Sequence, residues 1–104
     1  MKNTNFVINS LSSAIERNPN NASAYNVRGC AYLGLEQYDS GITDYSTAIK
    51  LDPNNALVYN DRGSAYLALK YYDLAKKDFE KFLSLVPEDD QTAVQIKQFL
   101  NSLE

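Results

Sequence analysis

The sequence of 104 residues contains no histidine and a single cysteine, Cys30. Without imidazole, the chain lacks the side chain that most often acts as a general base or binds a metal. Metal sites built from thiolate and imidazole ligands are therefore excluded, and one cysteine cannot form an internal disulfide. We expect neither a metal nor a cofactor.

Glycine is also scarce, and its four residues do not cluster. They stand in or beside expected helices, so no glycine-rich phosphate loop is present: Gly29, Gly34, Gly41 and Gly63. The acidic pair Asp89-Asp90 is better explained as a helix cap than as a catalytic carboxylate pair, because acidic groups favour the positive end of a helix. The sequence thus predicts a protein that is not an enzyme.

Long apolar runs and clustered basic residues are missing as well. No stretch approaches the ~20 apolar residues that span a bilayer, and residues 1–5 show no apolar segment of a signal peptide. The ten basic residues are spread along a chain of net charge −3, whereas nucleic-acid binders usually carry a basic stripe. Unless the chain is part of a longer exported protein, we expect a cytoplasmic protein that binds neither membrane nor nucleic acid.

A repeat with a period of 34 residues dominates what is present. Identical residues recur at this distance: Tyr25 and Tyr59, Arg28 and Arg62, Gly29 and Gly63, Asp44 and Asp78, and Pro53 and Pro87. A fixed period of this length indicates an array of identical supersecondary units. We expect one domain over residues 1–104, with a half-repeat helix at 1–21, repeats at 22–55 and 56–89, and a capping helix at 90–104.

Apolar residues recur at helical spacing in every segment. No segment shows the strict alternation of apolar and polar residues that a half-buried strand would have. Six helices are predicted, over residues 3–17, 22–35, 38–50, 56–69, 72–85 and from Asp89 or Asp90 to Leu103. Asn21 is the expected N-cap of the second helix. The first helix carries an apolar stripe made of Val7, Ile8, Leu11, Ala14 and Ile15.

This pattern resembles the tetratricopeptide repeat family. The resemblance rests on Tyr25, Gly29, Ala31-Tyr32, Tyr38, Tyr45, Ala48 and Asp52-Pro53 in one copy, and on Tyr59, Gly63, Ala65-Tyr66, Tyr72, Ala75, Phe79 and Pro87 in the other. It implies an all-α fold, in which antiparallel helix pairs form a short right-handed α-solenoid.

Several packing expectations follow from the repeat. The glycines permit close helix contact, and the tyrosines at repeat positions, Tyr72 included, belong to the core, while Tyr71 is expected to be exposed. Phe82 replaces the small Ala48, and we expect its ring to meet Phe99 or Leu100 of the last helix.

Two recurring arginines, Arg28 and Arg62, are candidates for binding phosphate or carboxylate groups. The competing interpretation is structural, because an aspartate follows each arginine after 16 residues, at Asp44 and Asp78. We favour arginine–aspartate pairs, either within each repeat or from Arg62 back to Asp44, because such pairs would satisfy both partly buried charges.

The candidate binding surface is the concave groove that the first helix of each pair lines in this family. By resemblance, the partner-binding residues are Asn26, Val27, Cys30, Leu33, Leu57, Asn60, Asp61, Ser64, Leu67 and Gln95. The amides of Asn26 and Asn60 could grip an extended peptide backbone, or only solvate the face. Cys30 is interpreted as a small surface residue rather than a reactive thiol.

Some members of the family hold a partner's C-terminal carboxylate with lysine, arginine and asparagine in this groove. The matching positions here are Asn26, Cys30, Asp61, Gln91 and Gln95. They contain no cation, and Asp61 would repel a carboxylate. The expected partner is therefore a neutral to mildly basic, partly apolar segment.

The sequence as a whole predicts a protein–protein interaction adaptor or scaffold that binds a peptide or helical segment in its groove. The alternative is a structural module that associates with itself, or belongs to a longer array, through the N-terminal helix. That helix lacks its usual packing partner, which leaves Phe6, Val7 and Leu11 as an apolar edge. In that case the protein would form a homo-oligomer.

Overall fold

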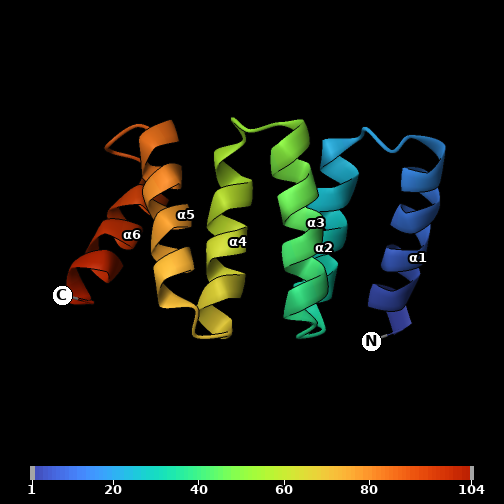
Figure 1. The fold of residues 1–104 in the computed structure, drawn as a ribbon, viewed down its shortest axis with the longest axis horizontal. Coiled ribbons are helices and arrows are strands. Elements are labelled where there is room, and N and C mark those ends of the chain that lie inside the picture. The colour runs from blue at the N-terminus through green and yellow to red at the C-terminus, as the bar shows by residue number, and fades with distance from the viewer. Residues whose placement is uncertain (1, 104) are drawn as a thin grey trace. The chain divides into compact units, whose positions relative to one another are not determined.

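The computed structural model describes residues 2–103, which form six α-helices and no strand. The helices are α1 (Lys2–Arg17), α2 (Ala22–Gly34), α3 (Tyr38–Leu51), α4 (Ala56–Ala68), α5 (Tyr72–Leu85) and α6 (Gln91–Ser102) (Figure 1). The predicted all-α fold of helix pairs, of the α-solenoid type, is confirmed. The chain divides into two compact units, residues 1–53 and 54–104, each of which is described by itself.

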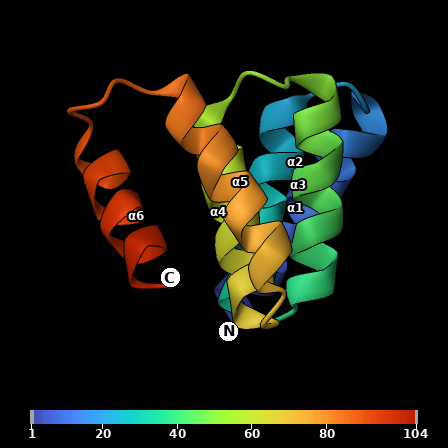
Figure 2. The same cartoon turned by 60° about the vertical axis from the view of Figure 1, so that its left-hand side comes forward.

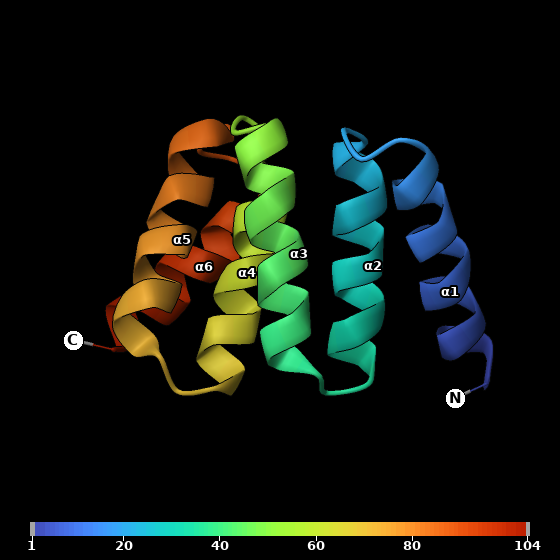
Figure 3. The ribbon, with the colours of Figure 1, turned by 45° about the vertical axis from the view of Figure 1, so that its right-hand side comes forward.

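Unit 1 consists of an antiparallel pair, α2 and α3, with α1 packed along α2 (Figure 3). The Oδ1 atom of Asn21 accepts a hydrogen bond from the Ala24 amide at 3.3 Å, as the predicted N-cap requires. The turn after α2 passes through Glu36, whose φ of 60° is left-handed. The amides of Glu36 and Gln37 bond back to the carbonyls of Leu33 and Tyr32, each at 2.9 Å, which satisfies the end of the helix.

Close contact between α2 and α3 depends on the missing side chain of Gly29. A Cβ atom there would lie 2.8 Å from Tyr45 Cε1 and 3.2 Å from the carbonyl oxygen of Gly41. In unit 2, a Cβ on Gly63 would lie 2.8 Å from Phe79 Cε1. Both glycines therefore permit the close helix approach that the repeat predicted.

Unit 2 consists of the pair α4 and α5, followed by α6, which contacts α5. Helix α6 runs in the direction opposite to α5 (Figure 2). Asp90 is the N-cap of α6, because its Oδ1 atom accepts from the Ala93 amide at 3.0 Å. The ring of Phe99 contacts Phe79, edge-on and at 6.0 Å between centroids, rather than Phe82. The alternative expectation, a contact of Phe82 with Leu100, stays a prediction. Since α6 runs back along α5, Phe99 near its end lies beside the middle of α5. Phe82 is buried at 4% exposure.

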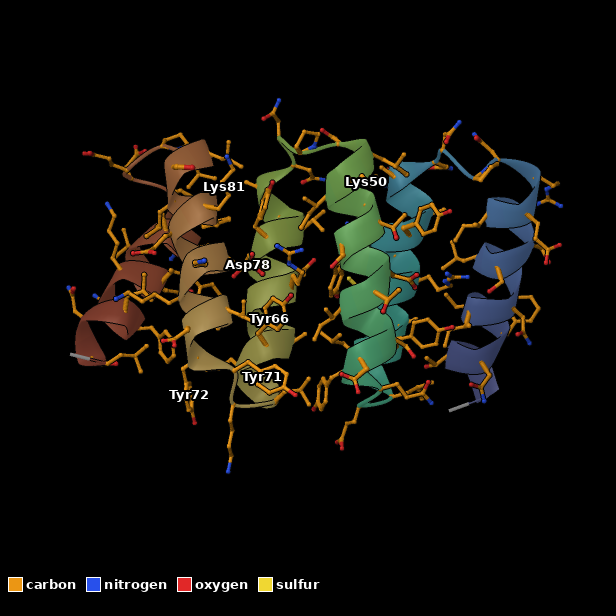
Figure 4. All side chains as sticks on the ribbon, in the orientation of Figure 1. Lys50, Tyr66, Tyr71, Tyr72, Asp78 and Lys81 are labelled. Atoms are coloured by element: carbon orange, nitrogen blue, oxygen red, sulfur yellow. The ribbon has the colours of Figure 1, made fainter. Side chains whose placement is uncertain are left out.

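Most repeat tyrosines lie in or beside the core. Tyr45 and Tyr59 are buried, and Tyr71 is 53% exposed as predicted. The core prediction for Tyr72 is wrong, because its side chain is 51% exposed. As the first residue of α5, its ring projects past the start of the helix (Figure 4). Val7 of the α1 apolar stripe is 39% exposed, as expected for a residue of the apolar edge on α1.

Candidate functional site

The outward face of α2 carries the first group of predicted binding residues. Val27 is 48% exposed and Cys30 is exposed, whereas Asn26 and Leu33 are half-buried. The Oδ1 atom of Asn26 is buried and accepts no hydrogen bond from the described residues. Because solvent does not reach this atom, the carboxamide would have to rotate before a ligand could donate to it. The apolar surface of Val27 is therefore the accessible feature of this face.

The same face of α4 carries the second group. Leu57 is 55% exposed and Ser64 is exposed, whereas Asn60, Asp61 and Leu67 are half-buried. The Ser64 hydroxyl donates to the Asn60 carbonyl at 3.0 Å, so it is held against its own helix. In α6, Gln95 is exposed. Each unit thus presents an exposed aliphatic side chain among small polar groups on the first helix of its pair.

Arg28 joins all three helices of unit 1. Its Nε and Nη2 atoms donate to Asp44 Oδ2 and Oδ1 of α3 at 2.8 and 2.7 Å, and Nη1 donates to Ser12 Oγ of α1 at 3.1 Å. The guanidinium lies between the rings of Tyr25 and Tyr32, at 5.8 and 5.9 Å from their centroids. The Asp44 side chain is only 4% exposed. The positive charge of Arg28 and the negative charge of Asp44 are therefore both largely buried and paired with each other.

Unit 2 repeats this cluster. Arg62 donates from Nε and Nη2 to the two Asp78 carboxylate oxygens at 2.8 and 2.7 Å, and its guanidinium lies 5.6 Å from the Tyr66 ring centroid. Asp78 projects from α5 toward α4 (Figure 4). The hydrogen bonds to the aspartates raise the pKa of Arg28 and of Arg62, although burial acts in the opposite direction. The structural interpretation of the arginines is confirmed within each repeat, because Asp44 and Asp78 accept hydrogen bonds from the guanidinium groups of Arg28 and Arg62.

A hollow of about 270 Å³ lies between α1 and α2 in unit 1. The described residues that line it are small or uncharged: Asn3, Thr4, Val7, Cys30, Ala31 and Gly34. Cys30 accepts a hydrogen bond at Sγ from the hydroxyl of buried Tyr45, at 3.2 Å. The sequence analysis identified Cys30 as a small face residue, but it did not identify the hollow.

Unit 2 has a larger hollow of about 450 Å³ at the start of α5. It is lined by Lys70, Tyr71, Tyr72, Asp73 and Leu74. Sequence reasoning missed Leu74, which is 45% exposed. One signal was available, because position 74 falls one period after Ser40, which is exposed. A leucine at a position that is solvent-facing in the other copy marks an exposed apolar spot.

Two further observations concern the described residues alone. Among residues 2–103, no group of three or more cysteine, aspartate or glutamate side chains is placed to hold a metal ion. No helix in the same range has both the length and the apolar character needed to cross a bilayer.

Comparison with sequence families gives three matches to tetratricopeptide repeat models. Two models described as tetratricopeptide repeat match residues 56–89 and 11–43, and one described as TPR repeat matches residues 31–70. The match at 56–89 has the same bounds as the second repeat predicted from the period. No curated protein sequence matches the chain.

Solved structures resemble the chain over most of its length. The Arabidopsis OM64 TPR domain is 31% identical with a TM-score of 0.89, and the match covers 99% of this chain and 84% of that one. The second TPR of Spaghetti (RPAP3), bound to the HSP90 peptide SRMEEVD, is 32% identical with a TM-score of 0.74, and the match covers 76% and 73%. The TPR2B domain of yeast Sti1 in its pHsp70 complex is 27% identical with a TM-score of 0.79, and the match covers 88% and 74%.

Proposed function

Because this chain belongs to the tetratricopeptide repeat family, we propose that it is a non-enzymatic protein-interaction adaptor, which binds a peptide or helical segment of a partner on the outward faces of α2 and α4. One observation carries the proposal: Val27 and Leu57, on these two faces, are 48% and 55% exposed. Contiguous exposed apolar patches rimmed by polar residues are typical of protein-interaction surfaces. The peptide complexes of the Spaghetti and Sti1 domains support this class of function.

The proposed partner is neutral to mildly basic and partly apolar. Its apolar side chains would cover Val27 and Leu57, and Asp61 on α4 would favour a positive charge on the partner. The arginines of both helices are already bound to aspartates, so they offer no cation to an acidic ligand. This chemistry differs from that of an acidic peptide such as SRMEEVD.

A peptide selection tests the proposal. A library of random peptides displayed on phage would be selected on wild-type protein, and selected peptides would be titrated against variants by fluorescence anisotropy. We expect Leu57→Arg to weaken binding about tenfold or more, because it removes an apolar contact and adds a charge that repels a basic peptide. The matched control is Leu74→Arg on α5, a leucine of similar exposure outside the proposed face. Equal losses in the two variants would argue against these faces.

A second candidate function is self-association through α1. Within unit 1, α1 packs against α2. Phe6 of α1 is 72% exposed and Val7 is 39% exposed. A solution mass that rises with protein concentration would support this function, whereas a constant monomer mass would eliminate it.

A further inference from the structure

We infer that α1 is a gate on unit 1: it opens as one helix while α2 and α3 stay paired, and a hydrogen bond from Arg28 to Ser12 holds it closed. The inference goes beyond the proposed adaptor function, because it concerns how much of α2 a partner can reach. Three features of unit 1 support it: the composition of α1, its shallow packing and the polar contact that attaches it.

The composition of α1 favours a weak helix. Seven of its 16 residues are asparagine, serine or threonine, which have low helix propensity. Its first turn contains no acidic residue, which would interact favourably with the positive end of the helix. Isolated helices of about 12 to 15 residues are marginal in water even when they are rich in alanine. The stability of α1 must therefore come from its contact with α2.

That contact buries α1 only shallowly. Of residues 3–17, none is buried, whereas each of the other five helices contains at least two buried residues. The side chains of Phe6 and Val7 are 72% and 39% exposed, and the hollow of about 270 Å³ lies between α1 and α2. The other terminal helix, α6, buries Ala93 and Ile96. Of the two terminal helices, α1 should therefore open more easily.

A serine hydroxyl attaches the middle of α1 to α2. Ser12 Oγ accepts from Arg28 Nη1 at 3.1 Å, and it donates to the Ile8 carbonyl of its own helix at 2.7 Å. Asp44 holds the guanidinium through Nε and Nη2, so Nη1 is presented to α1 in a fixed orientation. Hydrogen bonds from charged donors are stronger than those between neutral groups. We call this bond the latch of the gate.

The rest of unit 1 keeps its contacts when α1 opens. Asp44 of α3 still holds Arg28, and the close contacts at Gly29 are made with α3. The Tyr25 hydroxyl donates to the Pro19 carbonyl at 3.0 Å, which ties the loop after α1 to α2. The movement should therefore be confined to residues before Pro19.

Opening enlarges the surface of α2 that a partner can cover. In the closed state, α1 lies across the hollow from Cys30, Ala31 and Gly34. These residues follow Val27 at helical positions i+3, i+4 and i+7, so they extend the same face of α2. Opening also frees the Nη1 donor of Arg28. The gate thus controls access to one side of the proposed binding face.

Native-state amide hydrogen exchange, followed by NMR at rising urea concentrations below the unfolding transition, would test the inference. We expect the protected amides of α1 to exchange at least about tenfold faster than those of α2 and α3. Their rates should also depend less on urea, because opening exposes less surface than unfolding. Equal rates and equal urea dependence in the three helices would overturn the gate.

Two serine variants test the latch. Ser12→Ala removes the acceptor of Arg28, whereas the control Ser13→Ala removes an exposed hydroxyl from the same helix. Both substitutions raise helix propensity by a similar amount, so the difference between them reports the latch. We expect α1 to exchange about fivefold faster in Ser12→Ala than in Ser13→Ala. Equal rates in the two variants would overturn the latch.

A third variant tests whether α1 opens separately from the pair. Gly29→Ala places a Cβ atom 2.8 Å from a Tyr45 ring carbon of α3. Because this strain is present whether α1 is docked or open, exchange in α2 and α3 should accelerate about fivefold or more while exchange in α1 stays unchanged. Equal acceleration in all three helices would show that unit 1 opens as one body, and would overturn the inference.

Discussion

At the scale of single residues, the buried aspartates that hold the repeat arginines are the most sensitive positions. Asp44→Asn removes the charge opposite Arg28 and leaves the guanidinium enclosed between two tyrosines. We expect a loss of about 3 kcal/mol in the free energy of unfolding, measured by urea denaturation. Asp39→Asn, at an exposed position on the same helix, should lose less than about 1 kcal/mol. Similar losses in the two variants would mean that the buried pair does not stabilise the fold.

The raised pKa of the arginines determines how this pair responds to pH. A cation whose pKa is higher in the folded state contributes its stability fully below the unfolded pKa and loses it only as pH rises through the folded value. For Arg28 and Arg62 that loss lies beyond about pH 12. The difference in unfolding free energy between wild type and Asp44→Asn should therefore stay constant from about pH 6 to 10. A decline of that difference between about pH 6 and 10 would mean that Arg28 does not stay charged and paired with Asp44 in the folded protein.

Two glycines of α2 should respond in opposite directions to the same substitution. Gly29→Ala places a Cβ atom 2.8 Å from a Tyr45 ring carbon and 3.2 Å from a backbone oxygen. The resulting overpacking should outweigh the gain in helix propensity, with a net loss of about 1 to 2 kcal/mol. Gly34→Ala meets nothing within 4 Å and should stabilise by up to about 1 kcal/mol. Thermal unfolding followed by circular dichroism measures both, and a stabilised Gly29→Ala would refute the close helix contact.

At the scale of elements, the start of α6 offers a matched pair of adjacent acids. Asp90 accepts from the Ala93 amide, whereas Asp89 lies one residue outside the cap and is exposed. Asp90→Ala should cost about 1 kcal/mol and Asp89→Ala only a few tenths. Amide hydrogen exchange should also accelerate in the first turn of α6 in Asp90→Ala alone. Equal effects would show that both acids act only through the helix dipole.

The helices themselves could be predicted because apolar spacing and the 34-residue period independently indicated the same elements. The arginine–aspartate pairs were also predictable, since the 16-residue spacing occurs twice in the same helical context. The exposure of Tyr72 was not, because it depends on the direction that a side chain takes at the first residue of a helix. The Phe79–Phe99 contact depends on how α6 leans on α5, which spacing within one helix does not specify.

At the scale of the whole molecule, charge should set the choice of ligand. The faces proposed to bind carry Asp61 and no unpaired arginine. We expect the acidic peptide SRMEEVD, which the second TPR of Spaghetti binds, to bind at least about tenfold more weakly than a selected neutral or basic peptide. Isothermal titration calorimetry of both peptides would check this expectation. Comparable affinities would refute the proposed partner chemistry.

The candidate site was less predictable than the fold, for a physical reason. The repeat determines which positions face outward, but the two copies differ at those positions: Val27 becomes Asp61 and Cys30 becomes Ser64. The hollow between α1 and α2 arises from the packing of two helices with different sequences, so no sequence motif predicts it. The exposure of these side chains and the residues that line the hollow could therefore be obtained only from the three-dimensional structure.

The most direct test of the central claim is to map where a selected peptide contacts the protein. Amide chemical shifts of labelled protein would be followed by NMR during titration with the peptide. The account predicts that the largest changes cluster on the outward faces of α2 and α4, around Val27, Leu57 and Ser64. Changes concentrated around Tyr71, Tyr72 and Leu74 at the start of α5, with these faces unaffected, would contradict it.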